Sequence, residues 1–344
     1  MRLCHKAVEH STCHVDKTVT FLCSISSMDT FTQILLPLHR LFIFKSDNCC
    51  MRCDLHVHSK ASGMFNLAGL KHLCQECYSE PLEVYDLLKR RGMTAITITD
   101  HDSVAGSEGL RSRQDFFLSE EVTVRMPSGT EAHIGVYNIT ERDHVDIQRR
   151  AKDFISLLMY LTERKLFFSV NHVFSGLTGR REAEDFAWFE SYVPAYEARN
   201  GQMWRKSNES AAHLAKRLGK IAVAGSDAHA LAGVGLTYTE VPGARNADEF
   251  FSGLRNGMGR VAGNHGSFGR ITADVFTIIG SLFLDKRWTS VFAPIVPLVP
   301  VFSAGHWLNE IRFCKKWTAA MENGGARKRM LWDIDPGFEA NLAS

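Results

Sequence analysis

Apolar positions along the chain switch between a helical period and a strand period, and the switches predict an α/β fold. Apolar residues recur at helical spacing between Pro81 and Gly92, with Ser79 as the expected capping residue. Residues 94–99 then alternate like a strand, and a first strand starting at residue 51 precedes the helix. The order strand, helix, strand predicts parallel pairing.

Further elements continue this pattern towards the C-terminus. A turn at residues 127–130 separates two alternating runs, which predicts a hairpin. The pattern predicts a hairpin of 121–124 with 132–137, helices over 146–164 and 210–218, and strands over 166–170, 195–201 and 220–224.

Histidine and aspartate gather where the apolar runs end. His56 and His58, and likewise Asp227 and His229, stand two residues apart, so a strand would point each pair to one face. His101 follows a third run. Because parallel strands of a barrel bring their carboxyl ends to one pocket, the three segments together predict a metal site, although one His-x-His alone is a weak signal.

In order, the segments Asp-Leu-His-Val-His-Ser (54–59), Thr-Ile-Thr-Asp-His-Asp-Ser (97–103), Asn-His-Val (171–173) and Gly-Ser-Asp-Ala-His (225–229) resemble the PHP family, named for polymerase and histidinol phosphatase domains. The similarity runs from about residue 51 to 271. It implies a distorted seven-stranded β/α barrel with a polynuclear metal site that hydrolyses phosphoesters. The expected organisation is an extension (1–50), a PHP barrel (51–272), an apolar C-terminal helical appendage (273–322) and a mobile tail (323–344).

The resemblance also implies roles for particular residues. One metal would be held by His56, His58, Glu121 and Asp227; a second by Glu121, as a bridge, with His133 and His172; and a third by His101 and His229. The resemblance further makes Asp227, Glu121 and His229 the catalytic residues. Three alternatives stay open: Glu120 in place of Glu121, an exposed polar role for His133, and a hydrogen-bonded core role for His172.

Other polar residues are expected to support this centre. Asp54 and Asp100 precede ligand histidines and would orient the imidazoles, as would Glu197 and Asn200 unless these contact the substrate. Candidates for binding the substrate phosphate are Arg180, Arg199, Lys206 and His265.

The loop after His58 departs from the family pattern. Family members often place an acidic residue or a histidine five or six positions later, where this chain has Gly63 and Met64. The third metal therefore has two visible protein ligands, and Asn66, His72 or water are the alternatives for the missing one.

Imidazoles with a few carboxylates favour two or three Zn²⁺, Mn²⁺ or Fe ions over a site for Mg²⁺ alone. Such ions activate water and neutralise phosphoryl charge. The leading functional hypothesis is hydrolysis of a small phosphodiester, nucleotide or short oligonucleotide. The alternatives are a histidinol-phosphatase-like phosphomonoesterase and a non-catalytic regulatory PHP module.

Composition narrows the class of partner and the compartment. With 344 residues and a formal net charge of +2, the chain lacks the basic excess that long duplex nucleic acid attracts. Nine scattered cysteines and no secretory signal favour a reducing, cytoplasmic setting. Cys50, Cys53, Cys74 and Cys77 have the spacing of a four-cysteine zinc site, but Cys53 adjoins the first ligand segment, which favours ordinary thiols.

The two ends differ from the barrel. The first fifty residues show no clear period, and we expect them to be dispensable, with a targeting or partner segment as the rival hypothesis. Residues 276–313 are apolar and aromatic but interrupted by Pro294, Pro297 and Pro300, which disfavours a membrane span. This segment is expected to pack on the barrel, on a second copy as a homodimer, or on a membrane surface, in that order.

Overall fold

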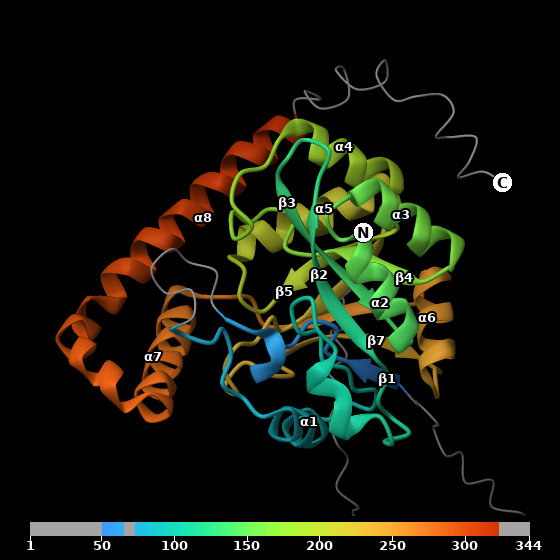
Figure 1. Ribbon diagram of the computed structural model, residues 1–344. Helices are drawn as coiled ribbons and strands as arrows, with labels where there is room; N and C mark the ends of the chain where they lie inside the picture. The colour runs from blue at the N-terminus through green and yellow to red at the C-terminus, as the bar shows by residue number, and fades with distance from the viewer. Residues whose placement is uncertain (1–49, 65–72, 323–344) are drawn as a thin grey trace, which may run out of the picture. The chain divides into compact units, whose positions relative to one another are not determined.

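The computed structural model describes residues 50–64 and 73–322, which form a mixed α/β fold with two sheets (Figure 1). One sheet has five strands in the order β2-β3-β4-β5-β6, and the other has three in the order β1-β7-β8. The strands are β1 (Cys50–Cys53), β2 (Ser119–Arg125), β3 (Glu131–Tyr137), β4 (Phe167–Val170), β5 (Ala195–Asn200), β6 (Ile221–Gly225), β7 (Thr237–Pro242) and β8 (Arg260–Gly263). The predicted α/β class is confirmed.

Helices connect and cover these strands. The α-helices are α1 (Pro81–Arg90), α2 (Glu141–Arg150), α3 (Phe154–Glu163), α4 (Ala183–Tyr192), α5 (Arg205–Leu218), α6 (Ala247–Arg255), α7 (Phe268–Asp285) and α8 (Val299–Glu322). The 3-10 helices are η1 (Lys60–Ser62), η2 (Ala105–Leu110) and η3 (Arg287–Leu298).

Two details of the predicted helices are wrong. The N-cap residue of α1 is Glu80 rather than Ser79, and no side chain caps this end. The predicted helix over 146–164 is two helices, because the Asp153 carboxylate accepts hydrogen bonds from the amides of Ile155 and Ser156 and so starts α3.

Strand pairing is mixed. The predicted hairpin is the antiparallel pair β2–β3, β4 continues antiparallel to β3, and the pairs β4–β5 and β5–β6 are parallel. The predicted strand at 94–99 has no ladder: Ile96 forms one isolated bridge with Phe116.

The predicted closed seven-stranded barrel is not confirmed, since the ligand-bearing segments join their neighbours through isolated bridges such as Val57 with Ala228. In these segments, side-chain oxygens accept hydrogen bonds from the backbone amides. Val57 donates to Thr99 Oγ1 at 2.9 Å, and Ser226 donates to Asp54 Oδ1 at 2.8 Å. Side-chain acceptors interrupt the ladders at the place where the ligands converge.

Three apolar clusters hold the layers together. The largest packs α2, α3, α4 and α5 against β2 to β5, and the C-terminal half of α8 joins it through Cys314, Trp317 and Met321. Helix α6 packs on β1 and β7, and α1 packs beside Val57 and Ala228.

The predicted ends of the barrel differ slightly from the structure. The limit at residue 272 falls inside α7, whose cap is Ser267, and β1 begins at Cys50. Most of the N-terminal extension, residues 1–49, and the tail at 323–344 lie outside the described residues, so the expectations for them stay predictions.

Candidate metal centre

The structure brings the eight expected metal ligands into four overlapping groups, within each of which potential ligand atoms lie no more than 4.8 Å apart. The groups are His56/His58/Asp227, His56/Glu121/His172, His101/Glu121/His133 and His58/His101/His229. Segments far apart in sequence supply them, after β1, on β2 and β3, and after β4 and β6. The ligand role of each residue stays a prediction.

Glu121 lies at the middle of the cluster. Its Oε2 is 3.1 Å from His56 Nε2 and 3.1 Å from His101 Nδ1. Its Oε1 is 3.3 Å from both His133 Nδ1 and His172 Nε2. Oε2 also lies 3.5 Å from His58 Nε2. Each carboxylate oxygen thus faces a different set of imidazoles, which is the geometry that a bridging ligand requires.

Neighbouring Glu120 points elsewhere, because successive residues of a strand face opposite sides. Its Oε2 lies 2.9 Å from His144 Nδ1 and accepts a hydrogen bond from Gln148 Nε2 at 2.8 Å. The structure therefore favours Glu121 over Glu120 as the cluster carboxylate.

Carboxylates and a hydroxyl orient the imidazoles. His56 Nδ1 lies 2.8 Å from Glu197 Oε1, and since an ionised carboxylate only accepts, this nitrogen donates and Nε2 faces the cluster. His58 Nδ1 lies 2.9 Å from Ser62 Oγ, which donates to Asp100 Oδ1 at 2.8 Å. These contacts fix the ring orientations, as partners of metal-bound histidines do.

The expected role of Asp54 needs correction. Its carboxylate contacts no imidazole among the described residues, but accepts backbone N–H bonds from His56, Ser226 and Gly235. Burial raises the pKa of Asp54 to about 6 despite these bonds. Asp54 therefore ties together the backbones of two ligand segments, and Asp100 acts on His58 only through Ser62.

Asp227 is held rigidly. Its Oδ1 is 3.4 Å from His56 Nε2 and 3.3 Å from His58 Nε2, while its Oδ2 accepts from Asn200 Nδ2 at 3.0 Å. The backbone φ is +51°, a left-handed value that few residues other than glycine adopt, and the Asp227 amide donates to the His56 carbonyl at 2.6 Å. Such strain concentrates at functional sites.

Gly225 explains the close approach of the two segments. A Cβ at this position would lie 2.2 Å from the Cβ of His56 and 2.4 Å from its backbone nitrogen. Only glycine lets the end of β6 pass directly beside His56.

The cluster suits a divalent cation electrostatically. His56 Nε2, His58 Nε2 and Glu121 Oε2 are buried without a hydrogen-bond partner, although all face the same space. Burial alone would raise the pKa of Glu121, but His56, His133 and His101 hold it well below its usual value. Burial would lower the pKa of His56, yet Asp227 and Glu121 raise it. A cation would coordinate these unpaired atoms and would also neutralise the negative charge of the buried carboxylates.

The candidate phosphate-binding residues occupy different environments. Arg180 is exposed and pairs with Glu182, and Lys206 lies over the Trp204 ring. Arg199 donates to the Gly263 carbonyl at 2.9 Å.

His265 is connected to the cluster by a short chain of hydrogen bonds. His265 Nδ1 is 2.9 Å from Asn208 Nδ2, and Asn208 Oδ1 accepts from the Asn200 amide. Asn200 in turn donates to Asp227, so a chain of contacts links His265 to the cluster.

Sequence reasoning missed Ser62, Asn171 and Glu76. Asn171 Nδ2 donates to Glu121 Oε1 at 2.9 Å, and Glu76 Oε2 lies 3.4 Å from His101 Nε2. Asn171 precedes His172 in the Asn-His-Val segment and could have been found from it. No pattern in the sequence around Glu76 indicates a role for it.

The four-cysteine alternative finds no support in the described residues. Cys53, Cys74 and Cys77 are buried free thiols, Cys50 is a partly buried one, and none belongs to a potential ligand group. The expectation of ordinary thiols is consistent with this arrangement.

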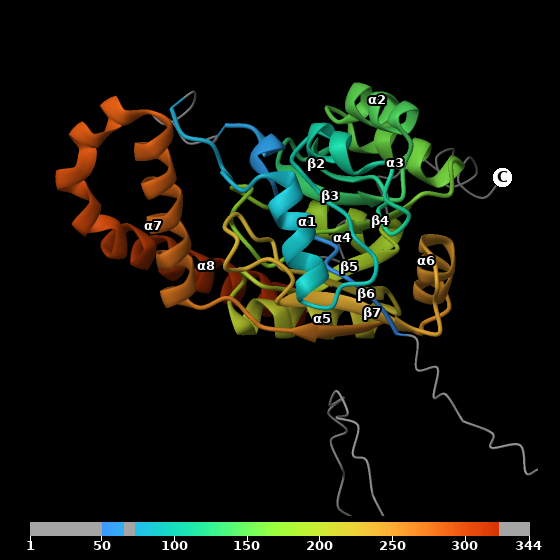
Figure 2. The same cartoon turned by 90° about the horizontal axis from the view of Figure 1, so that it is seen from below.

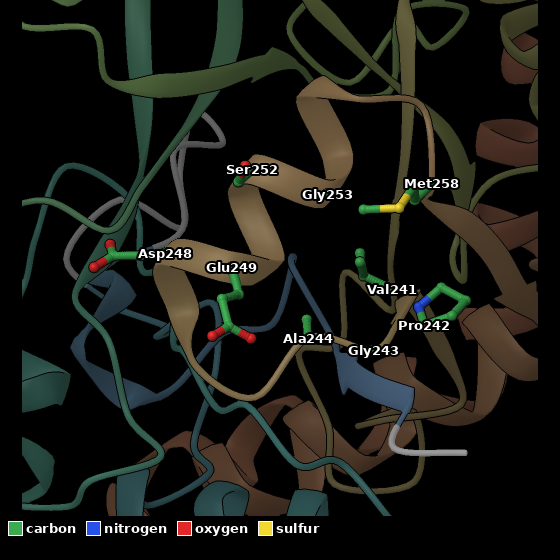
Figure 3. A pocket seen from close by; sticks show the side chains of 9 residues that line it. All are labelled: Val241, Pro242, Gly243, Ala244, Asp248, Glu249, Ser252, Gly253 and Met258. Atoms are coloured by element: carbon green, nitrogen blue, oxygen red, sulfur yellow. The ribbon is translucent and has the colours of Figure 1, made fainter. Parts of the chain in front are cut away.

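A hollow of about 530 Å³ lies elsewhere, between the end of β7 and α6 (Figure 3). Its lining includes Asp248 and Glu249 but no histidine, and Glu249 already pairs with Arg245. None of the potential ligand groups found among the described residues includes a residue that lines this hollow.

Residues 205–258 match the family model "PHP-associated". The uncharacterized protein MJ1587 of Methanocaldococcus jannaschii is 31% identical over 81 residues, which is 24% of this chain and 43% of that protein. The match thus spans less than half of the archaeal relative.

Two solved structures are similar at lower levels. A two-domain protein from Bacteroides vulgatus, containing a predicted PHP-like metal-dependent phosphoesterase, has TM-score 0.49 and 17% identity over 62% of this chain and 65% of its own. The lesion-specific endonuclease PfuEndoQ from Pyrococcus furiosus has TM-score 0.43 and 13% identity over 62% and 57%.

The PHP-associated match runs from α5 to the end of α6 and includes Gly225, Asp227 and His229. These residues lie in the cluster that the four ordered motifs predict. Over residues 205–258 the chain is therefore similar to the PHP-associated family.

Proposed function

We propose that this protein is a metal-dependent hydrolase of phosphoesters, acting on a small phosphodiester, a nucleotide or a short oligonucleotide. The proposal rests on Glu121, whose two oxygens face two separate sets of imidazoles and so suit a pair of ions. Bound there, Zn²⁺, Mn²⁺ or Fe would activate water and neutralise charge on the phosphoryl oxygens.

The residues of the chain would divide the remaining work. Glu197 and Ser62 keep the His56 and His58 rings in place, and Asn200 keeps Asp227 in place. His229 is the more exposed member of its pair, with its Nδ1 3.1 Å from the Asp227 carbonyl. His229 would act through the third ion, which it would help to hold and which would stabilise charge on the leaving oxygen, with Arg199 and His265 as candidates to bind the phosphate.

Small substrates are expected to be preferred over long duplex DNA by at least tenfold in kcat/KM. The net charge of +2 provides no broad basic surface for a duplex backbone. Hydrolysis of dinucleotides and of a long duplex should be compared at several salt concentrations. Tight, strongly salt-dependent binding of the duplex would contradict this preference.

Two other functions are distinguished by the same purified protein. A phosphomonoesterase of the histidinol-phosphatase type would hydrolyse monoesters and leave diesters intact, and a regulatory module would bind metal but hydrolyse neither. The protein loaded with Mn²⁺ should therefore be tested against matched monoesters and diesters. We expect the diesters to react faster; absence of hydrolysis in every case would refute the proposed function.

We also propose a cytoplasmic setting. All five cysteines in the described ranges, Cys50, Cys53, Cys74, Cys77 and Cys314, are free thiols, which a reducing compartment maintains. Fractionation of cells that produce the protein, with compartment markers, tests this placement; recovery with secreted or periplasmic proteins would contradict it.

A further inference from the structure

We propose that Glu76 supplies the missing protein ligand of the third metal, an inference that rests on the proposed metal-dependent function. Its Oε2 is 3.4 Å from His101 Nε2. His101 shares a potential ligand group with His58 and His229. Glu76 lies outside the four potential ligand groups, but it faces the Nε2 of His101, whereas Glu121 Oε2 lies 3.1 Å from the Nδ1. Glu76 therefore brings a carboxylate to the side of the His101 ring that Glu121 does not reach.

The backbone explains how Glu76 reaches this place. Met64 and Gln75 form an antiparallel bridge, and the Glu76 amide donates to the Gly63 carbonyl at 3.1 Å. Glu76 thus lies beside Gly63 and Met64, the two positions at which the family pattern would have an acidic residue or a histidine. Gly63 itself has φ +88°, which an aspartate would adopt only with strain. The other two candidates, Asn66 and His72, lie outside the described residues.

The test is a calorimetric titration of the full chain with Mn²⁺, together with metal analysis after dialysis. Wild type is expected to bind three ions, and Glu76→Gln should weaken one binding event by tenfold or more. Glu83→Gln is the matched control, because Glu83 is an exposed glutamate in the first turn of α1. It should bind like wild type.

The outcomes separate this proposal from the proposed function. Three unchanged binding events in Glu76→Gln, or only two ions in an active wild type, would overturn the role of Glu76 and leave the hydrolase proposal standing. A wild type that binds no metal would refute both. Circular dichroism of Glu76→Gln establishes that any loss arises in a folded protein.

A second observation concerns the hairpin of α7, η3 and α8, whose turn lies away from the sheets in both views (Figures 1 and 2). Residues 288–309 contain no Asp, Glu, Lys or Arg. Trp288, Val291 and Phe302 are 63%, 69% and 67% exposed. We infer that this tip, residues 288–302, inserts into one leaflet of a lipid bilayer.

Exposure at the tip has no helical period. Residues 290–295 are exposed in succession, so apolar side chains cover every side of the turn rather than one face. A surface for a second copy of the chain would present one apolar face with a polar rim. An element that is apolar all round suits a hydrocarbon environment, and Trp288 at its base suits the interface.

The ends of the hairpin exclude a single crossing of the bilayer. Residues 287–322 are long enough to span, and an 18-residue stretch within them is apolar enough, with mean hydropathy 1.6. However, Trp317 and Met321 belong to the main apolar core, and the Glu310 carboxylate accepts from the Gly176 amide at 3.1 Å. Asp274 in α7 accepts from Gln202 at 2.7 Å. Both ends are therefore held by the same body, and only the tip can enter the lipid.

Sedimentation with phosphatidylcholine vesicles tests this inference, because neutral lipid isolates apolar insertion from charge attraction. Replacement of Val291, Ile295 and Val301 by aspartate should lower the partition coefficient at least tenfold. The matched control replaces Leu82, Val145 and Met159 by aspartate, because these are exposed apolar residues outside the tip. It should partition like wild type, and unchanged Mn²⁺ binding shows that each variant is folded.

A direct test is tryptophan fluorescence in the presence of brominated lipid, which should quench the emission of Trp288 in wild type. The Trp288→Phe variant should lose most of this quenching. Failure of wild type to sediment with vesicles, or equal sedimentation of the tip variant, would overturn membrane insertion. A wild-type dimer that the tip variant makes monomeric, without vesicle binding by either protein, would overturn it in favour of an interface between copies.

Discussion

Asp227→Asn is expected to lower phosphoester hydrolysis by on the order of a hundredfold or more, equivalent to about 2.7 kcal/mol in activation free energy. Asparagine preserves the shape and the contact with Asn200, but it removes a charge that lies within 3.4 Å of both His56 and His58. A neutral amide is a weaker ligand for the cation that would activate water. The measurement is kcat and KM for the best diester at saturating Mn²⁺.

Asp248→Asn is the control for this prediction, because Asp248 is a carboxylate near the surface hollow and outside the ligand groups. It should retain wild-type activity. If Asp227→Asn is fully active while its fold and metal content match those of wild type, Asp227 has no part in catalysis.

Removal of metal is expected to lower the free energy of unfolding by roughly 4 kcal/mol at an ion concentration about a thousand times the Kd, and so to lower Tm by several degrees. The reason is that Glu121 Oε2, His56 Nε2 and His58 Nε2 are buried without hydrogen-bond partners. Thermal unfolding should be followed with Mn²⁺ and after exhaustive chelation, and Mn²⁺ should restore the higher Tm.

Glu121→Gln supplies the comparison for metal removal. One oxygen of Glu121 lies beside His56 and the other beside His133. The Tm of this variant should therefore fall much less on addition of the chelator than the Tm of wild type does. An identical Tm of wild type with and without metal would mean that the cluster is stable without a cation, against this prediction.

Much of the candidate centre could be predicted because its chemistry is encoded locally. A spacing of two residues puts His56 beside His58 and Asp227 beside His229 on one side of an extended segment, whatever lies around them. The family order then supplied Glu121, His133 and His172, which the structure brings into the same groups. The order of apolar runs likewise predicted the α/β class.

The helix over 146–164 shows where periodicity misleads. Its apolar spacing continues across the break, but the Asp153 side chain offers the backbone a competing acceptor and starts a new helix. The distorted seven-stranded barrel is not confirmed for a related reason, because side-chain acceptors such as Thr99 and Asp54 replace ladder partners around the cluster.

By itself, the sequence determined the residue types that can bind metal and the strand ends on which they stand, because both depend on neighbours along the chain. Only the tertiary structure decided which carboxylate oxygen faces which imidazole. It also placed Ser62 between Asp100 and His58, in hydrogen-bond contact with both, and Glu76 beside His101. Such contacts join residues brought together by packing, and no local period records them. The exposed tip at 288–302 follows the same rule: composition made it apolar, but its exposure is a consequence of where α7 and α8 are held by the core.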